Sequence, residues 1–438
     1  MSGDSSEEST WIDRDLPIQR MLARPIRRFL HLETAGGLVL LVAAIAALII
    51  ANTAWSGVME RFWERDLTLL AIGDFHLEES LRGWINDGLM TIFFFVVGLE
   101  IKLELVSGEL RDRKRASLPV LAAFGGMVVP AALYAAINAG GAGSDGWGIP
   151  MATDIAFVVG ALALLGSRVP SGLKAFVLTV AIVDDIGAIV VIGIFYTERI
   201  SFGWLAVAGA GLALVVLMRL RRVWYVPAYV LVGVIVWLAT LESGIHATIA
   251  GVALGLLAPA TSFRPETTRV DIDSSSPRKE VRSTLFDVRE SNPIAQRLQD
   301  IVHPWSAFII LPLFAFANAG IRLSSDAISE AIASPVAWGI VVGLVVGKPV
   351  GILAATWLGI RLHLGAPPPG VTSRHLVAAS VLAGIGFTVA LFITGLAFTA
   401  EDITAQAQMG VTAASLVAAV IGVLIMRGAK PGQAGEPQ

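Results

Sequence analysis

The feature that most constrains this chain is a series of long apolar runs separated by mostly short polar segments. The apolar core of a bilayer is roughly 30 Å thick, and an α-helix needs roughly 20 apolar residues to cross it. The runs have about that length and lack the alternation typical of a β-barrel. They predict an all-α polytopic membrane protein with twelve transmembrane helices. The expected spans are residues 35–53, 83–102, 118–140, 148–166, 174–197, 203–219, 223–240, 244–260, 304–320, 335–360, 375–398 and 408–427.

The composition supports this prediction and excludes several other classes. Apolar residues make up 55% of the chain and charged residues 15%, whereas soluble domains have about 25% charged residues. A net charge of −3 gives no indication of a nucleic-acid partner. Because the chain has no cysteine, disulfides, thiolate metal sites and cysteine nucleophiles are excluded. No cofactor is expected.

The domain organisation follows from the positions of the polar segments. Residues 1–32 form an expected N-terminal arm, 33–427 a transporter domain, and 428–438 a short tail. The one long loop, at about 260–302, is rich in Ser, Thr, Arg and Asp. The first apolar run begins too late and is too long for a cleaved signal peptide.

The distribution of basic residues predicts the orientation. With the N-terminus inside, 26 of the 32 Lys and Arg residues fall in inner segments. Five fall in outer loops, and Lys348 lies within a span. Because cytoplasmic segments carry an excess of Lys and Arg, both termini are expected in the cytoplasm. Spans 3–5 then run opposite to spans 10–12, as in an inverted repeat.

Charged residues within membrane spans are costly and therefore indicate function. Asp184 and Asp185 lie near the middle of one span. Adjacent residues of a helix point about 100° apart, so the two carboxylates are expected to have different roles. A buried carboxylate can hold a proton or a hard cation, and this competition is sufficient for ion exchange if the site opens to one side at a time. The alternative is a buried acid pair that is hydrogen-bonded to neighbouring groups.

Two spans contain signals for helix interruption. Pro150 precedes Thr153 and Asp154, which are good N-cap residues, so a half-helix is expected to begin near Thr153. Residues 383–388 of span 11 contain two glycines, which make that helix interruptible as well. Two interrupted spans at corresponding positions are typical of a transporter site. Asp154 is either a cap alone or also a charge that balances the helix ends.

The other candidate residues have weaker signals. Lys348 is expected to pair with an aspartate of span 5 or with negative half-helix ends, in a structural or a transport role. Glu100 and Glu104 are expected at the inner mouth, as a cation funnel or as solvated charges. The remaining candidates are Asp87 and His246 near the outer ends of spans 2 and 8, and His303 at the inner start of span 9; each has a structural alternative.

Several motifs carry a resemblance to a known family. They include Val183-Asp-Asp-Ile-Gly-Ala188, Ala152-Thr-Asp-Ile-Ala-Phe157, Gly347-Lys-Pro and Gly384-Ile-Gly-Phe-Thr388. Further examples are Trp84-Ile-Asn-Asp-Gly-Leu-Met, Val97-Gly-Leu-Glu100, Gly244-Ile-His-Ala-Thr248, His303-Pro-Trp and Leu311-Pro-Leu-Phe-Ala-Phe-Ala-Asn-Ala-Gly320. From about residue 25 to 427, the chain resembles the bacterial sodium/proton antiporters of the NhaA type. This family is itself an example of transporters with inverted repeats and interrupted helices.

The resemblance implies a fold, an activity and residue roles. It implies an inner-membrane protein whose interrupted spans 4 and 11 cross near mid-membrane, and electrogenic exchange of one cytoplasmic Na⁺ or Li⁺ for two external H⁺. Asp185 would be the main ion and proton site, with Asp184 as its partner. From the residues themselves, Thr153 is a further candidate at the ion site, with a cap or backbone contact as the alternative. Asp154 and Lys348 would balance the charges of the half-helix ends. The family also implies a homodimer through a β-hairpin, here within residues 67–80, with Gly73-Asp74 at its centre.

Two places depart from the family pattern. Gln299 and Asp300 stand where the family has the Glu and His that take part in pH activation, and only His303 remains. The pH response is therefore expected to differ. The loop at about 260–302 is also longer than the family pattern.

Three other functions fit the sequence less well than the antiporter. A sodium-coupled symporter of an organic anion would need polar groups to hold its solute, and few Asn, Gln or Arg residues lie inside the spans. An intramembrane aspartyl protease would need a Gly-x-Gly-Asp motif, and Lys348 would suppress its shared-proton chemistry. A passive channel would need a pore ring, which the sequence does not suggest. The chain is therefore predicted to be a transporter and not an enzyme.

Overall fold

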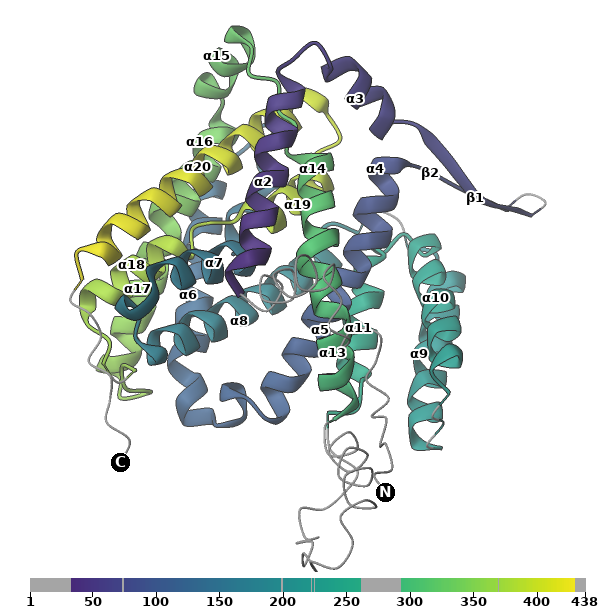
Figure 1. The fold of residues 1–438 in the computed structure, drawn as a ribbon, viewed down its shortest axis with the longest axis horizontal. Helices are drawn as coiled ribbons and strands as arrows, with labels where there is room; N and C mark the ends of the chain where they lie inside the picture. The colour runs from purple at the N-terminus through teal and green to yellow at the C-terminus, as the bar shows by residue number, and fades with distance from the viewer. Residues whose placement is uncertain are drawn as a thin grey trace, which may run out of the picture.

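The computed structural model describes residues 33–429 except 73–74, 198–199, 222, 224, 261–292 and 369. Within this part of the chain the protein is almost entirely helical, and the helices pack into one body (Figure 1). Seven described helices are long and apolar enough to cross a membrane, and up to nine spans result if each of two bent helix pairs counts as one. The protein is therefore an all-helical polytopic membrane protein, and the expected count of twelve stays a prediction.

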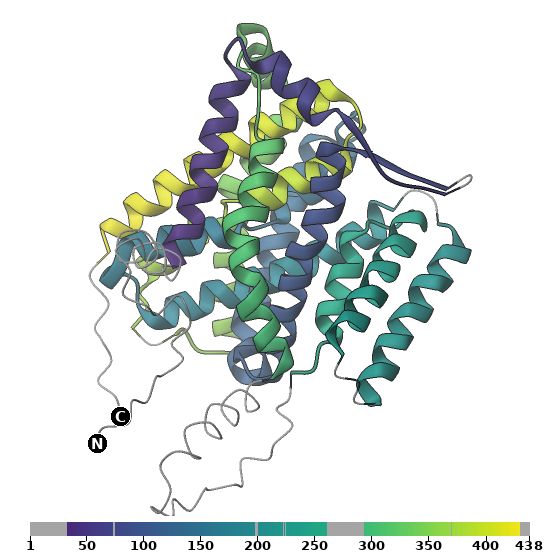
Figure 2. The same cartoon turned by 45° about the vertical axis from the view of Figure 1, so that its right-hand side comes forward.

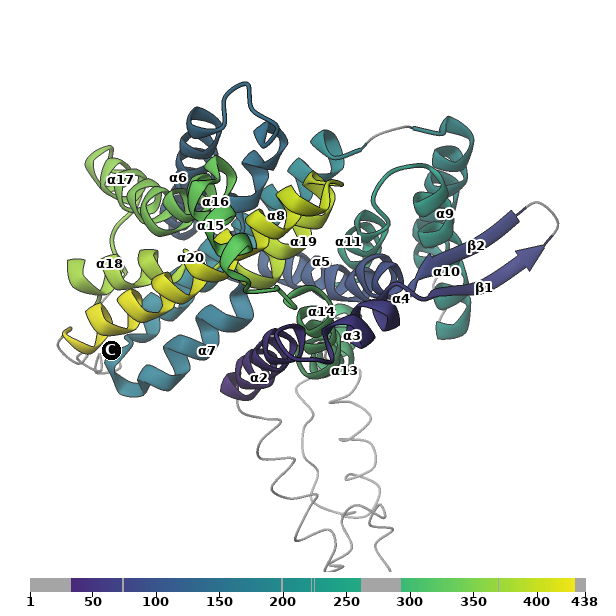
Figure 3. The same ribbon diagram turned by 90° about the horizontal axis from the view of Figure 1, so that it is seen from above.

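The first span leads into an exposed hairpin. Helix α2 (Glu33–Ala51) turns by 116° into α3 (Ser56–Trp63). Strands β1 (Asp66–Ile72) and β2 (Phe75–Ser80) then pair antiparallel. The hairpin predicted within residues 67–80 is thus present, although its expected centre, Gly73-Asp74, lies outside the described residues. It projects from the body on the side of α9 (Phe202–Leu220) and α10 (Val226–Glu242), as Figures 1 and 3 show.

The second span is one continuous helical run. It comprises α4 (Leu81–Gly83), the π-helical turn η2 (Trp84–Leu89) and α5 (Met90–Val106). Ser80 caps this run, because its hydroxyl accepts a hydrogen bond of 3.0 Å from the Gly83 amide. Asp87 therefore lies inside the helical run and does not cap its start.

Close packing of small residues positions the helix that carries Lys348. Helix α17 (Lys348–Arg361) follows the π-helical turn η7 (Gly343–Gly347) and α16 (Pro335–Val342), and it packs along α6 (Arg113–Ile137). A Cβ atom on Gly125 or Gly351 would overlap the facing backbone. The two helices approach closely because small residues meet there, as is common between membrane helices.

Two apolar runs are interrupted in the middle of the body. The 3₁₀ segment η4 (Ser144–Met151), which contains Pro150, is followed by extended residues 152–154 and by α7 (Ile155–Leu165). Helices α18 (Ser373–Leu382) and α19 (Phe387–Ala397) meet at residues 383–386 with a bend of 42°. The half-helix expected near Thr153 begins at Ile155, with Asp154 as its N-cap.

The remaining helices surround these interruptions. Helix α8 (Ser171–Phe195) carries the adjacent aspartates, and α20 (Glu401–Arg427) packs on α18 and α16. Helix α14 (Leu311–Asn318) lies beside α2, while α9, α10 and α11 (Thr248–Leu257) stand together at one side (Figure 2). The ninth span begins earlier than expected, because α13 (Ile294–Trp305) already contains His303 and continues through the π-helical turn η6 (Ser306–Ile310). Three short helices complete the description: η3 (Glu109–Arg111), η5 (Gly166–Arg168) and α15 (Ser325–Ala333).

Candidate functional site

The two interruptions are joined directly by hydrogen bonds. The Asp154 amide donates to the Ile385 carbonyl at 2.7 Å. The Thr153 hydroxyl lies 3.1 Å from the Ala383 carbonyl. Backbone groups freed from helical hydrogen bonds at one break are thus satisfied at the other, as buried polar groups require.

Asp154 bridges the starts of two half-helices. Its Oδ1 accepts from the Phe157 amide at 3.1 Å, as the N-cap of α7. Its Oδ2 accepts from the Thr388 amide at 2.9 Å and from the Thr388 hydroxyl at 2.5 Å, at the start of α19. Because helix N-termini carry partial positive charge, the buried carboxylate has a favourable environment at both of them. Asp154 is therefore the N-cap of α7 and also accepts hydrogen bonds at the start of α19.

Thr388 is a site residue to which sequence reasoning assigned no role. It belongs to the motif that ends span 11's glycine-rich stretch, and it follows the helix restart at Phe387. A Thr in the first turn of a half-helix that begins after two glycines is the signal that could have identified it.

Asp184, Thr153 and Lys348 form a buried cluster beside the breaks. The Thr153 hydroxyl contacts Asp184 Oδ2 at 2.8 Å, and Lys348 Nζ lies 3.0 Å from the same oxygen. Asp184 and Lys348 are both 0% exposed. Lys348 Nζ also donates to the Met151 carbonyl, at the end of η4. The lysine therefore touches both kinds of partner expected for it: an aspartate of α8 and the carbonyl end of a half-helix.

One oxygen of Asp184 is left without a hydrogen bond. Asp184 Oδ1 is buried and has no hydrogen-bond partner among the described residues. Unpaired buried carboxylate oxygens are costly, so this atom is suited to a proton or a cation. Asp185 is the next residue on the same helix, and only 4% of its surface is exposed.

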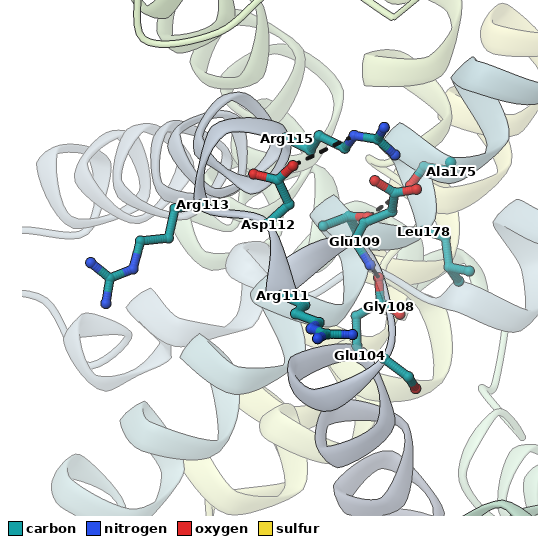
Figure 4. A pocket seen from close by; sticks show the side chains of 11 residues that line it. Glu104, Gly108, Glu109, Arg111, Asp112, Arg113, Arg115, Ala175 and Leu178 are labelled. Atoms are coloured by element: carbon teal, nitrogen blue, oxygen red, sulfur yellow. Dashed lines mark hydrogen bonds and ion pairs between the residues drawn. The ribbon is translucent and has the colours of Figure 1, made fainter. Parts of the chain in front are cut away.

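The inner-mouth candidates lie along α5. Gln299 of α13 donates to Glu100 Oε1 at 3.3 Å, and Glu104 Oε1 accepts from the Glu109 amide at 2.9 Å. Glu104 also lines a cavity of about 640 Å³ between the end of α5, the start of α6 and the N-terminal part of α8 (Figure 4). Arg111, Asp112 and Arg115 lie around the same cavity, with Asp112 and Arg115 paired at 3.7 Å.

The remaining candidates contact other parts of the protein. The backbone carbonyl of Asp87 accepts from Trp237 Nε1 at 3.0 Å. His246 precedes α11, and its Nε2 lies 2.7 Å from the Tyr196 carbonyl at the end of α8. His303 lies within α13, on the same helix as Gln299. These three residues thus lie on or beside η2, α11 and α13, whereas the cluster of Asp184, Thr153 and Lys348 is built from α8, α17 and the segment before α7.

Comparison with known proteins places this geometry in a family. The family model described as Na⁺/H⁺ antiporter 1 matches residues 27–426. The chain belongs to the Na⁺/H⁺ antiporter 1 family. The resemblance seen in the motifs is thereby confirmed, and the family is one of transporters and not of enzymes.

Curated members of the Na⁺/H⁺ antiporter 1 family align over nearly their whole length. Na(+)/H(+) antiporter NhaA 3 of Frankia alni is 46% identical over 414 residues, covering 93% of this chain and 89% of the relative. Na(+)/H(+) antiporter NhaA of Rhodopirellula baltica is 45% identical, with 93% and 94% covered. The NhaA protein of Yersinia pseudotuberculosis serotype O:1b is 42% identical, with 92% and 96% covered. The match thus includes every element of the site described above.

Proposed function

We propose that the protein exchanges cytoplasmic Na⁺ or Li⁺ for external H⁺ at the aspartates of α8. The observation that carries this proposal is the buried Asp184 oxygen without a hydrogen-bond partner, next to Asp185 and to the ammonium of Lys348. Membership of the family supports the identity of the exchanged ions, because the family model and the relatives are described as Na⁺/H⁺ antiporters.

The exchange step is a competition for carboxylate oxygens. Na⁺ is a hard cation that prefers oxygen ligands, and Asp185, Asp184 and the Thr153 hydroxyl supply oxygens at this point. A proton on Asp185 removes the charge that holds Na⁺, so the site carries one ion or the other across. Exchange is electrogenic in this proposal, because more protons enter than Na⁺ ions leave.

Lys348 and Asp154 compensate charge while the ions change. Lys348 stays paired with Asp184 when Asp185 binds its ion, and Asp154 keeps the two positive helix starts balanced. Both charges lie inside the apolar body, where an uncompensated ion would be strongly disfavoured. This compensation allows the site to release and bind ions while the joint between the two interruptions stays intact. The joint is the set of hydrogen bonds that Asp154 makes with Ile385 and Thr388.

The wider architecture of the proposal follows the basic-residue distribution. The chain has twelve spans in a bacterial inner membrane, with both termini, the 1–32 arm and the 428–438 tail in the cytoplasm. Spans 3–5 and 10–12 form an inverted repeat whose interrupted members cross at Asp154 and Ile385. Na⁺ enters from the cytoplasm past Glu100 and Glu104, and access alternates between the two sides.

A homodimer completes the proposal. The β1–β2 hairpin projects from the body and exposes an unpaired strand edge (Figure 3). Strand edges pair readily with a second chain, and the family resemblance implies dimerisation through such a hairpin.

The test is a proteoliposome assay with a pH-sensitive dye inside. An acid-inside gradient is built, Na⁺, Li⁺ or K⁺ is added outside, and the assay is repeated from pH 6 to 9. We expect Na⁺ and Li⁺ to alkalinise the interior and K⁺ to have no effect. Asp185→Asn should abolish the response, because the amide binds neither a proton nor Na⁺ strongly, while Asp402→Asn on the exposed start of α20 should retain it.

Two outcomes would contradict the proposal. Exchange at the parental rate by Asp185→Asn would remove Asp185 from the site. The absence of any response at every pH, in a folded protein, would favour a sodium-coupled symporter with the same fold.

A further inference from the structure

Two buried tyrosines hold the segment that leads into the site. Segment η4 lies between the C-terminal ends of α6 and α8, and it ends at Met151, whose carbonyl accepts from Lys348. Tyr134 lies near the end of α6 and is 0% exposed, and Tyr196 directly follows α8 and is 9% exposed. The two phenols thus approach η4 from two different spans.

The hydroxyl groups contact the backbone of η4 and of the residue before it. Tyr134 Oη donates to the Gly143 carbonyl at 2.8 Å. Tyr196 Oη donates to the Asp145 carbonyl at 2.7 Å and accepts from the Gly148 amide at 3.3 Å. The hydroxyl of Tyr196 therefore joins two backbone positions that lie three residues apart in η4.

Glycines make this close approach possible. A Cβ atom on Gly148 would lie 2.8 Å from Tyr196 Oη, and one on Gly146 would overlap the Tyr134 hydroxyl. The ring of Trp147 also packs edge-on against Phe195, with centroids 5.0 Å apart. The backbone of η4 is therefore in direct contact with the phenols over several residues.

The same tyrosines are tied to other spans. The Tyr196 carbonyl lies 2.7 Å from His246 Nε2, before α11. Asn138 Nδ2 donates to the carbonyls of Tyr134 and of Pro335, both at 3.2 Å, which joins the end of α6 to the start of α16. Movement of η4 would therefore have to break hydrogen bonds to two phenols that are themselves fixed in place.

We propose that Tyr134 and Tyr196 are positioning residues that lock η4 and keep the outer side of the ion site closed in this conformation. The two phenols hydrogen-bond to the backbone at Gly143, Asp145 and Gly148, and not to Asp184 or Asp185 of α8. They act through η4, which carries the Met151 carbonyl and leads into Thr153 and Asp154. Outward opening requires the hydroxyl contacts to break. This inference rests on the proposed function and adds the residues that control access from one side.

The absence of cysteine gives a direct test. Ile149 lies in η4 and is 0% exposed, so Ile149→Cys reports whether η4 is open. A membrane-impermeant maleimide is applied to right-side-out and inside-out vesicles that contain the full chain. Tyr196→Phe removes two hydrogen bonds. Because the loss of one net hydrogen bond alone produces a shift of roughly threefold to tenfold, labelling from the outside should rise by at least that factor in this background. Tyr134→Phe should act in the same direction.

Matched variants distinguish positioning from loss of structure. Tyr225→Phe, at a phenol that is 67% exposed, should label like the parent. Gly148→Ala, which displaces the Tyr196 hydroxyl, should reproduce the outside-specific rise and serves as the test if Tyr196→Phe does not fold. A rise of equal size from both sides would indicate general loosening and would overturn the proposal.

The kinetic readout separates the same alternatives. At equal amounts of folded protein, Tyr196→Phe should change the maximal exchange rate more than the KM for cytoplasmic Na⁺. Unchanged labelling together with an unchanged rate would also overturn the proposal. Labelling reads the conformation without any ion flux, so it remains informative even if the chain does not exchange Na⁺ for H⁺.

Discussion

Lys348 is buried at a point where a lone ammonium group would be strongly destabilising. Its contacts with Asp184 and with the Met151 carbonyl explain how the charge is retained there. An aspartate oxygen and a half-helix end together supply the compensation that neither could supply alone. The residue is thus part of the structure and of the proposed transport site.

Removal of Lys348 alone should be more harmful than removal of the whole pair. Lys348→Ala leaves Asp184 as an unpaired buried carboxylate, and we expect a loss of roughly 3–5 kcal/mol in the free energy of unfolding. The double variant Lys348→Ala with Asp184→Asn should recover much of that loss. Thermal unfolding followed by tryptophan fluorescence measures both. Equal stability of the single variant and the parent would show that the Lys348–Asp184 ion pair does not stabilise the protein.

Gln299 places a side-chain amide beside the carboxylate of Glu100, with Gln299 Nε2 at 3.3 Å from Glu100 Oε1. We expect Gln299→Glu to move the pH profile of exchange to more alkaline values, because two adjacent carboxylates repel each other and hold a proton between them more firmly. Exchange rates from pH 6 to 9 in proteoliposomes measure the midpoint. Gln296→Glu, on the exposed face of the same helix beside Asp300, should leave it unchanged. Identical midpoints for both variants would contradict a role for the Glu100–Gln299 contact.

At the scale of elements, the decisive feature is the joint between the two interrupted runs. Each break alone would leave buried backbone groups without partners, which is costly in an apolar environment. Together they satisfy each other through Asp154, Ile385 and Thr388. The joint is therefore a cooperative unit, and its stability depends on hydrogen bonds between elements more than 200 positions apart in the chain.

Thr388→Val should weaken this joint without changing side-chain volume much. The hydroxyl bond to Asp154 is lost while the amide bond remains, and a cost of roughly 2 kcal/mol is expected because the acceptor is charged. Thr394→Val in the same helix removes only a local bond to the Ala390 carbonyl and should cost clearly less. Thermal unfolding of the two variants provides the comparison. A larger loss of stability for Thr394→Val than for Thr388→Val would contradict a stabilising role for the hydrogen bond from the Thr388 hydroxyl to Asp154.

At the scale of the whole molecule, the hairpin is the most independent part. It projects from the helical body, and hydrogen bonds from Trp84 Nε1 to the Leu67 carbonyl at 2.9 Å and from the Gly83 amide to the Ser80 hydroxyl at 3.0 Å link it to the second span. Nothing in the ion site contacts it among the described residues.

Replacement of the hairpin by a short Gly-Ser linker should convert the proposed dimer into a monomer. The aspartate cluster lies elsewhere, so exchange should persist at a rate per chain within about twofold of the parent. Light scattering in detergent measures the mass, and the proteoliposome assay measures the rate. A dimer that survives the replacement would place the interface on another surface.

The sequence alone determined the class of protein, the positions of the apolar runs and most of the candidate residues. These follow from local properties. A run of about 20 apolar residues can be recognised without knowing which helices pack against it, and a charged residue within such a run stands out. The interruption of span 11 could also be predicted from the sequence, because two glycines weaken a helix wherever it packs.

Only the tertiary structure decided how these residues are partnered. It showed that Asp154 binds Thr388, that Lys348 binds Asp184 and the Met151 carbonyl, that Gln299 binds Glu100, and that two tyrosines hold η4. It also placed Asp87 inside a helix and began α13 at Ile294. The physical reason is that pairings between distant elements depend on which faces the packing brings together, and no periodicity within one span carries that information.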